Sequence, residues 1–382
     1  MKDSYSIIGG GIIGLSIGWQ LARKGMNVQI FERDAAGKGA SWVAAGMLAP
    51  RSEAGFEESE QLAFGLESVR LYPQFLKELE QDTGTKVAME PNGSLMIGLN
   101  RDDTERLRRM YDFRKKIGLP LTWLSGAEAR ELEPLISPRT VSAVSIPDDI
   151  HIDNHKLVEA LREAFLRCKG TLHEHTPVEQ VHIERDRVVN LRAAGKNFDA
   201  GTVILSAGSW SKSISGIPES ITPPVRPVKG QIITMRMDKS CELKHIIRAT
   251  DAYFVPKEDG RLVLGATSEE MGFDTTISAG LIKDLLEHAW EAVPSIYDLK
   301  IEIIEAGLRP ASRDHEPIIG PTEISNLYYA TGHFRSGILF APVTAYGVAE
   351  MLSTKTVPPI LRHYLPSRFF GTKQPSPAPH EA

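Results

Sequence analysis

Three glycines near the N-terminus have the spacing that brings a peptide backbone against a pyrophosphate. Gly9, Gly11 and Gly14 lie in the segment SIIGGGIIG, after a short apolar run and before a helical pattern over about 12–24. In such a turn the first glycine permits the bend, the second lets the backbone approach the phosphates, and the third lets helix and strand pack closely. The first helical N–H groups then face the phosphates. We interpret the segment as a dinucleotide-binding turn; a plain connection between strand and helix is the alternative.

An acidic residue follows this turn at the distance expected of a ribose-binding carboxylate. A second apolar run over 28–31 predicts a neighbouring strand, and it ends at Glu32, 18 residues after Gly14. A carboxylate here accepts hydrogen bonds from ribose hydroxyls and would repel a 2′-phosphate. The ligand is therefore expected to carry a free 2′-hydroxyl. Arg33 comes next, where stacking near an adenine ring and surface exposure both remain open.

A second glycine-punctuated segment, TGHFRSGIL, lies near the other end of the chain at 331–339. It precedes a helical pattern over 342–352 that begins with Pro342, a residue favoured in the first helical turn. The segment predicts that the chain returns to the same ligand and aims the positive end of this helix at it. A nicotinamide dinucleotide rarely needs such a return, whereas an enclosed flavin ring does, so the two segments together favour FAD.

Two further residues have the chemistry to recognise an acidic substrate. Arg309 follows a strand-like run over 301–306, and a guanidinium matches a carboxylate at two points; a surface or domain-bridging arginine is the alternative. Tyr253 alternates with apolar neighbours on an expected strand, a pattern that also suits a core tyrosine. Neither a catalytic triad order nor paired carboxylates accompany them. We therefore expect no general base, and hydride transfer from the substrate carbon directly to flavin N5.

Composition sets the remaining limits. The 382 residues can hold two domains, and the formal net charge of −5 argues against a nucleic-acid partner. Cys168 and Cys241 are the only cysteines and match no metal or redox spacing, so we expect no metal and a reducing, cytoplasmic location. No segment approaches the ~18–20 apolar residues of a membrane span. The proline-rich segment 371–382 is expected to be a disordered tail.

The order of elements predicts an α/β protein: a discontinuous Rossmann-type FAD-binding domain plus a substrate domain with an antiparallel β-sheet and helices. Helices are expected over 62–80, 104–117, 151–169 and 281–292, and further strands over 87–99, 178–183, 187–191, 202–205, 231–237, 252–256, 261–267 and 327–331. The turn at 257–260 predicts a hairpin. We assign 1–85, 146–220 and 305–365 to the FAD-binding domain, and 86–145 and 221–304 to the substrate-binding domain.

Four segments carry a resemblance to a known family: GGGIIG at 9–14, ASWVAAGMLAP at 40–50, GLRPASRDHEPIIG at 307–320 and GHFRSGILFAP at 332–342. With them the chain resembles the D-amino-acid-oxidase superfamily of flavoproteins, and within it the glycine oxidases linked to thiamine biosynthesis. The resemblance implies non-covalent FAD and oxidation of glycine, sarcosine or D-alanine by molecular oxygen. The products would be the 2-oxo acid (glyoxylate from glycine), ammonia or amine, and hydrogen peroxide. We also expect a homo-oligomer, a dimer or tetramer.

The resemblance also assigns residues. It implies that Arg309 binds the substrate carboxylate with help from Tyr253, and that Arg335 lies beside flavin and substrate. The residues expected to hold FAD are Gly9, Gly11, Ile12, Ile13, Gly14, Glu32, Arg33, Ala40, Ser41, Ala45, Gly46, Met47, Val178, Ala207, Gly208, Trp210, Gly332, His333, Arg335, Ser336, Gly337, Ile338 and Leu339. The chain departs from the family pattern at Asp251, where a histidine is expected, and at Ser268, where a methionine is expected. Both positions are expected near the substrate entrance.

Other functions fit parts of the same pattern. A related FAD-dependent D-amino-acid dehydrogenase would pass electrons to a quinone, and a sarcosine or proline oxidase would share the motifs. An RNA-modification flavoprotein domain, from a different functional class, should show a basic patch that this acidic chain lacks. A flavin-binding scaffold without catalysis would lack Arg309 or a substrate cavity.

Overall fold

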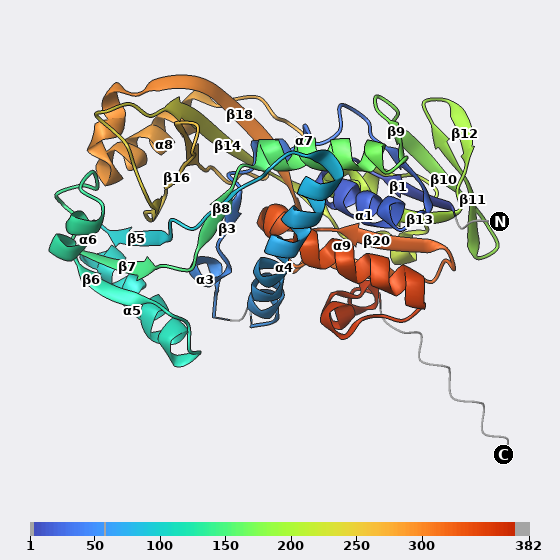
Figure 1. The fold of residues 1–382 in the computed structure, drawn as a ribbon, viewed down its shortest axis with the longest axis horizontal. Helices are drawn as coiled ribbons and strands as arrows, with labels where there is room; N and C mark the ends of the chain where they lie inside the picture. The colour runs from blue at the N-terminus through green and yellow to red at the C-terminus, as the bar shows by residue number, and fades with distance from the viewer. Residues whose placement is uncertain (1–3, 57–58, 371–382) are drawn as a thin grey trace, which may run out of the picture.

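The computed structural model describes residues 4–56 and 59–370 of the chain. The segment predicted to be a disordered tail, 371–382, lies outside the described residues. Two sheets dominate the elongated molecule and lie toward its opposite ends in Figure 1. The prediction of an α/β fold with a parallel nucleotide-binding sheet and a mainly antiparallel second sheet is confirmed.

The first sheet has six strands in the order β19-β20-β13-β1-β2-β9. They are β1 (Ser4–Ile8), β2 (Asn27–Phe31), β9 (Thr171–His173), β13 (Thr202–Leu205), β19 (Ile318–Pro321) and β20 (Leu327–Thr331). Every neighbouring pair is parallel except β19 with β20. Because strand side chains alternate between faces, Ile7 of β1 packs into one apolar cluster and Ile8 into another on the opposite face.

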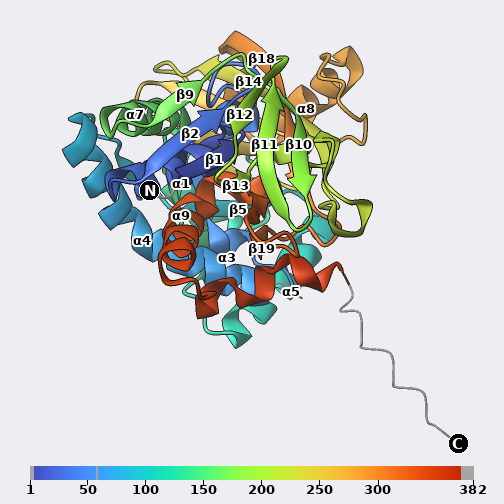
Figure 2. The ribbon, with the colours of Figure 1, turned by 90° about the vertical axis from the view of Figure 1, so that its right-hand side faces the viewer.

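Helices cover the Ile7 face, and a small sheet covers the Ile8 face (Figure 2). The helices are α1 (Ile12–Arg23), α4 (Ser59–Thr83), α7 (Asn154–Arg167) and α9 (Gly337–Thr354). The small antiparallel sheet consists of β10 (Val178–Glu184), β11 (Arg187–Ala193) and β12 (Lys196–Asp199). Residues 12–22 of α1 are all buried, because α7 and α9 pack on it from one side and the sheet from the other.

The second sheet has eight strands in the order β18-β14-β17-β16-β15-β5-β7-β6. They are β5 (Ser94–Gly98), β6 (Thr122–Ser125), β7 (Ser142–Ile146), β14 (Arg226–Arg236), β15 (Ile246–Arg248), β16 (Tyr253–Pro256), β17 (Arg261–Gly265) and β18 (Lys300–Ala311). The pair β15 and β5 is parallel and the others are antiparallel. The predicted hairpin at 257–260 joins β16 and β17.

One face of this second sheet packs on α8 (Ala279–Ala292), α6 (Gly126–Leu132) and a following 3-10 turn, Pro294–Asp298. The helix α5 (Arg101–Lys116) packs beside β5 and β7. Between the two large sheets lie α2 (Ala40–Val43), α3 (Pro50–Glu53) and a three-stranded sheet, β3 (Met47–Leu48), β8 (Ile150–Ile152) and β4 (Met89–Glu90). The other face of the eight-stranded sheet, near β14 to β17, is left to line a cavity.

Two predicted helix boundaries are wrong for identifiable reasons. The helix expected to begin at His151 begins at Asn154, because 150–152 form β8 and the Asp153 carboxylate caps the helix through the backbone N–H groups of His155 and Lys156. The helix expected to begin at Pro342 begins at Gly337, with Pro342 inside it. Proline cannot donate to the carbonyl four residues earlier.

Tyr72 compensates for that missing donor. The carbonyl of Ile338 lies four residues before Pro342, and the Tyr72 hydroxyl donates to it at 2.5 Å. The Ser68 hydroxyl donates to the next carbonyl, that of Leu339, at 2.6 Å. The long helix α4 therefore supplies, from outside, the hydrogen-bond donors for the carbonyls in the interrupted turn of α9.

The sheets do not by themselves define the domain boundaries. Strand β18 runs across the expected boundary at 305, so the domain division stays a prediction.

Candidate active site

A cavity of about 1210 Å³ runs between the two large sheets, from the glycine turn to the open face of the second sheet. Its wall includes segments that are far apart in sequence: the glycine turn, 37–47, 206–210, strands β14 to β17, 307–310 and 330–339. Of the residues predicted to bind cofactor or substrate, only Gly14 is absent from this wall. The cavity therefore brings the two ends of the chain together, as the two glycine-rich segments predict.

The glycine turn has the close contacts that its sequence implies. A Cβ atom on Gly9, where φ is +108°, would lie 2.4 Å from the carbonyl oxygen of Ser206, the residue directly after β13. A Cβ atom on Gly14 would lie 2.0 Å from the carbonyl oxygen of Gly9. Gly14 thus serves the packing of α1 on the turn rather than the cavity wall. The turn leaves the N-terminus of α1 facing the cavity at Ile12.

Glu32 is half-buried directly after β2, beside this turn. One carboxylate oxygen accepts from the backbone N–H of Gly10 at 2.7 Å, and the other from that of Asp34 at 3.0 Å. Burial raises the pKa of Glu32, while these two backbone donors oppose the rise. Next to it, the Arg33 guanidinium lies 4.2 Å from the centre of the Trp210 ring. Both side chains line the cavity.

The residues present fit a flavin dinucleotide. The turn and the first N–H groups of α1 suit a pyrophosphate, and the carboxylate of Glu32 at the end of β2 suits a ribose. At the far end, 44–47 and 332–339 both form parts of the wall, and Gly332 has a φ of +74° that most residues avoid. The 3-10 turn Phe334–Ser336 leads directly into α9, so the positive end of α9 begins in the cavity wall at Gly337.

At this far end, the side chains of Arg309 and Tyr253 lie directly over two glycines, Gly230 and Gly265, which we call the glycine floor. A Cβ atom on Gly230 would lie 2.2 Å from a terminal nitrogen of Arg309, and one on Gly265 would lie 2.3 Å from the Tyr253 hydroxyl. The Nη1 atom of Arg309 donates to the carbonyl of Thr267 at 3.0 Å and to that of Lys229 at 3.4 Å. The two side chains are therefore positioned by backbone and by missing Cβ atoms.

The environment keeps the Tyr253 hydroxyl protonated. Burial raises its pKa, and the nearby guanidinium groups of Arg309 and Arg248 oppose the rise. A protonated hydroxyl can donate a hydrogen bond to a carboxylate. The sequence pattern leaves a core tyrosine open as an alternative; the side chain is half-buried against an apolar cluster and also lines the cavity.

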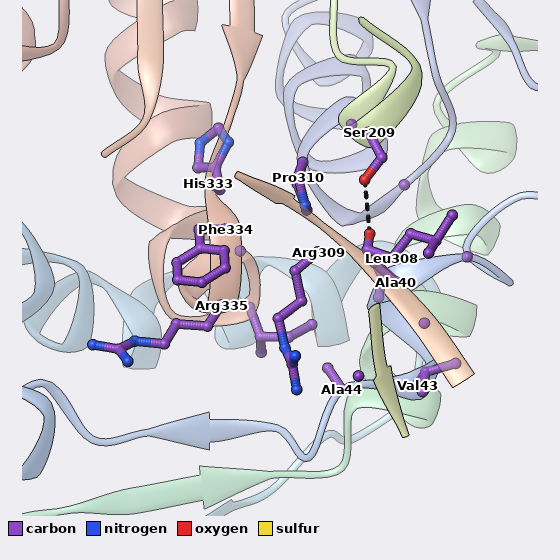
Figure 3. Close-up of a pocket in the computed structure, with 18 of the residues that line it drawn as sticks. Ala40, Val43, Ala44, Ser209, Leu308, Arg309, Pro310, His333, Phe334 and Arg335 are labelled. Carbon is purple, nitrogen blue, oxygen red and sulfur yellow. Dashed lines mark hydrogen bonds between the residues drawn. The ribbon is translucent and has the colours of Figure 1, made fainter. Parts of the chain in front are cut away.

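His333 and Arg335 flank the start of α9 differently. His333 is buried, its Nε2 lies 3.1 Å from the Thr344 hydroxyl, and burial lowers its pKa to about 3, so its ring is neutral. Figure 3 shows Arg309 and Arg335 extending in different directions from β18 and from the turn before α9. It also shows the hydrogen bond that the Ser209 hydroxyl donates to the Leu308 carbonyl, which is 2.9 Å long. This bond connects β18 to the segment that follows β13 of the first sheet.

Sequence reasoning missed residues of the wall, among them Gly230, Gly265 and Arg248, and one residue behind it, Lys257. Gly230 and Gly265 carry a readable signal, because glycine inside a strand marks a close approach. No sequence pattern indicates that Arg248, at the end of a short strand, lines the cavity. Lys257 sits in a hairpin turn and reads as a surface residue. Instead its buried ammonium donates to the carbonyls of Ala45 at 2.7 Å and Ile152 at 2.9 Å, which supports the wall segment 45–47 from behind.

The two departures from the family pattern, Asp251 and Ser268, both line the cavity beside β16 and β17. Lys257, which supports the wall segment 45–47, has its pKa lowered to about 7 by burial.

Throughout 4–56 and 59–370, no helix combines the length and the apolar character that crossing a membrane would require.

Comparison with known proteins identifies the class. The family model described as FAD dependent oxidoreductase matches residues 4–351. The chain therefore belongs to this family of FAD-dependent oxidoreductases. Within the family it is similar to glycine oxidase from Geobacillus kaustophilus, with 33% identity over 93% of this chain and 94% of the relative. The crystal structure of glycine oxidase from that organism superimposes with a TM-score of 0.89, covering 96% of this chain and 99% of the other.

A second relative is the bifunctional protein ThiO/ThiG of Synechocystis sp., which is 32% identical over 97% of this chain but only 54% of its own length. The predicted enzyme class, a flavin-dependent oxidoreductase that resembles glycine oxidases, is confirmed. The roles of the individual site residues stay predictions.

Proposed function

We propose that this enzyme oxidises the amine of small amino acids, among them glycine, sarcosine and D-alanine, with non-covalent FAD and molecular oxygen. The observation that carries the proposal is the pairing of Arg309 with Tyr253 over the glycine floor, at one end of a cavity whose other end is a pyrophosphate-binding turn. For glycine the balanced reaction consumes oxygen and water and yields glyoxylate, ammonia and hydrogen peroxide.

FAD, when bound, supplies the acceptor for the two electrons and the hydride of the substrate carbon. The chain's own residues bind and orient the substrate. The Nε and Nη2 edge of Arg309 forms no hydrogen bond with any described residue, and this edge can bind the carboxylate at two points. Tyr253 can donate a further hydrogen bond from its protonated hydroxyl.

His333, near the start of α9, is not suited to remove a proton. His333 is neutral and already faces Thr344, so it neither attracts the substrate carboxylate as a cation nor stands free as a base. This fits a substrate that binds with its amine neutral. The ammonium proton would then be lost to solvent before the oxidation step.

The positions of the two cysteines support non-covalent binding of FAD, because a cysteine can form a covalent bond to a flavin only where it reaches the ring. Neither Cys168 nor Cys241 belongs to the cavity wall. The resemblance to glycine oxidases of thiamine biosynthesis further leads us to propose that the product supplies the thiazole of thiamine. A cytoplasmic location and a homo-oligomeric state complete the proposal and rest on sequence reasoning alone.

A peroxide assay on the purified, FAD-loaded protein tests the proposal. Glycine, sarcosine, D-alanine and D-proline are supplied under air, and hydrogen peroxide and the 2-oxo acid are measured together. We expect both products in equal amounts from at least one of these substrates. Turnover with a quinone analogue but without peroxide would identify a dehydrogenase instead, and no turnover with any amino acid would refute the proposal.

A further inference from the structure

Arg248 is a third arginine in the wall of the substrate end, besides Arg309 and Arg335, and the proposed reaction does not use it. It lies at the end of β15, directly opposite Tyr253 of β16 in the strand register. Tyr253 is in turn opposite Gly265 of β17. Directly opposite residues share one face of a sheet, so Arg248 rises from the same cavity-facing surface as Tyr253. Arg309 approaches Tyr253 from the β14 and β18 side, and Arg248 flanks it on the other side.

The guanidinium of Arg248 is fixed at one nitrogen only. Its Nη1 donates to the Glu53 carboxylate at 3.2 Å and to the Ser52 hydroxyl at 3.4 Å, and lies 3.7 Å from the sulfur of Met47. Within the described part of the chain, Nε and Nη2 have no hydrogen-bond partner, and the side chain is 20% exposed in the cavity wall. Nε and Nη2 form the edge with which an arginine binds a carboxylate at two points.

Arg309 is held in the same way. Its hydrogen bonds also involve Nη1 alone, and its Nε and Nη2 edge is unused by other described residues. Two of the arginines at the substrate end, Arg309 and Arg248, are therefore anchored at Nη1, leave the carboxylate-binding edge unused by the described residues, and lie on either side of one tyrosine hydroxyl. Other charged groups face Arg248: Glu53 directly, and Asp149, which is buried beneath it near Ser52. Glu53 also lines the cavity, so its carboxylate competes with a ligand for Arg248.

We propose that Arg248 binds a second carboxylate, so that the enzyme favours amines with two carboxylates over neutral substrates of the same size. This inference rests on the proposed amine oxidation. The first carboxylate occupies Arg309, and the second reaches Arg248 across Tyr253. The second group can belong to the side chain of an amino acid, as in D-aspartate, or to a substituent on the nitrogen, as in iminodiacetate. The shared chemistry is an amine between two carboxylates.

Matched substrates provide the test on the FAD-loaded enzyme. D-aspartate is compared with D-asparagine, and iminodiacetate with sarcosine, by kcat/KM for peroxide formation. We expect at least one acidic member to exceed its neutral match by about tenfold or more, as for a charge-assisted two-point contact. The pair that shows the difference identifies the source of the second carboxylate. Equal efficiencies in both pairs would overturn the inference.

Variants test whether Arg248 causes the preference. Arg248→Gln should lower kcat/KM for the preferred acidic substrate at least tenfold more than for glycine. Glu53→Gln, which removes the competing carboxylate, should strengthen the preference. The matched control is Arg236→Gln, because Arg236 pairs with Glu302 on the surface of the same sheet, where its side chain is 43% exposed, and should leave the preference unchanged. An equal loss on all substrates would make Arg248 structural.

A binding measurement keeps this inference separate from the proposed function. Malonate and acetate are titrated into the FAD-loaded enzyme and followed by the change in flavin absorbance, which requires no turnover. Malonate should bind more tightly than acetate in the wild type, and Arg248→Gln should reduce that difference about tenfold. If no amino acid is oxidised but malonate is preferred, the proposed reaction fails and the second carboxylate site stands. If glycine is oxidised and malonate shows no advantage, the reverse holds.

Discussion

Arg309 can be changed without altering the core, because its guanidinium lies in the cavity over Gly230. Arg309→Ala should lower kcat/KM for glycine by about 10- to 100-fold, since it removes a charge-assisted, two-point contact, while FAD remains bound. Arg309→Lys should recover only part of the loss, because an ammonium lacks the planar fork. The measurement is steady-state peroxide formation together with the flavin content of each variant.

A carboxylate-free amine provides the control for this experiment. The wild type should oxidise it poorly, and Arg309→Ala should be no worse than the wild type on it. If both substrates lose activity equally, Arg309 supports the sheet rather than the substrate.

Glu32 belongs to the other end of the cavity. Glu32→Ala should weaken FAD binding about tenfold or more, the size of one lost charge-assisted hydrogen bond, and should leave the ranking of substrates unchanged once FAD is saturating. A flavin titration of the apoprotein measures the dissociation constant. Glu159→Ala serves as the matched control, because that glutamate is exposed and its ion pair with Lys38 at 3.6 Å is a surface contact. Unchanged affinity in Glu32→Ala would leave Glu32 as a turn-stabilising residue only.

At the scale of elements, α4 and α9 depend on each other through the proline in α9. Tyr72→Phe removes the hydroxyl that donates to the Ile338 carbonyl and leaves a buried acceptor without a partner. It should lower the free energy of unfolding by about 1–3 kcal/mol, measured by urea denaturation. Tyr297→Phe is the control, because Tyr297 is 78% exposed and should change little.

A double substitution tests the cause. In a Pro342→Ala background a backbone N–H is restored four residues after Ile338, so the same Tyr72→Phe change should cost clearly less. Equal costs in both backgrounds would mean that the Tyr72 hydroxyl contributes nothing specific to the interrupted turn.

The support of 45–47 by Lys257 predicts a pH dependence. Burial lowers the pKa of Lys257 from 10.5 to about 7, so between these values the unfolded chain binds more protons than the folded one. Stability should therefore rise with pH from about 7 toward 10. A neutral amine still has the two N–H donors that the Ala45 and Ile152 carbonyls require.

The measurement is the free energy of unfolding at a series of pH values. Lys257→Met should remove most of the rise, whereas Lys283→Met, at an exposed lysine of α8, should keep it. An identical slope in wild type and Lys257→Met would show that another group governs this pH range.

At the scale of the whole molecule, FAD should act as a non-covalent link between the two sheets. Acid precipitation of the yellow protein should release the flavin into the supernatant, because neither Cys168 nor Cys241 belongs to the cavity wall. Apoprotein should also unfold at a lower temperature, since a ligand present at a hundred times its dissociation constant adds about 2.7 kcal/mol. Colour retained in the washed pellet would contradict non-covalent binding.

Much of this architecture could be predicted because local patterns determined it. The glycine turn, the first βαβ unit and the 257–260 hairpin each depend on residues close together in sequence. The site was partly predictable, since Arg309 and the 332–339 loop stand in recognisable segments. Arg248 and Lys257 could not be predicted, because their roles depend on Glu53, Ala45 and Ile152, which only tertiary packing brings near. The start of α9 was missed because a tyrosine from α4 replaces the proline's missing donor.

The glycine floor also has a consequence for how this protein can change over generations. A single base change turns any glycine codon into an alanine codon, and at Gly230 or Gly265 the added methyl would meet the ends of Arg309 or Tyr253 rather than the core. Either side chain would have to move from the place where it meets the substrate, whereas the flavin-binding turn at the other end of the cavity would be untouched. A lineage under relaxed selection can thus lose the reaction in one mutational step and keep a folded flavoprotein, and these two codons are where such a loss would be found.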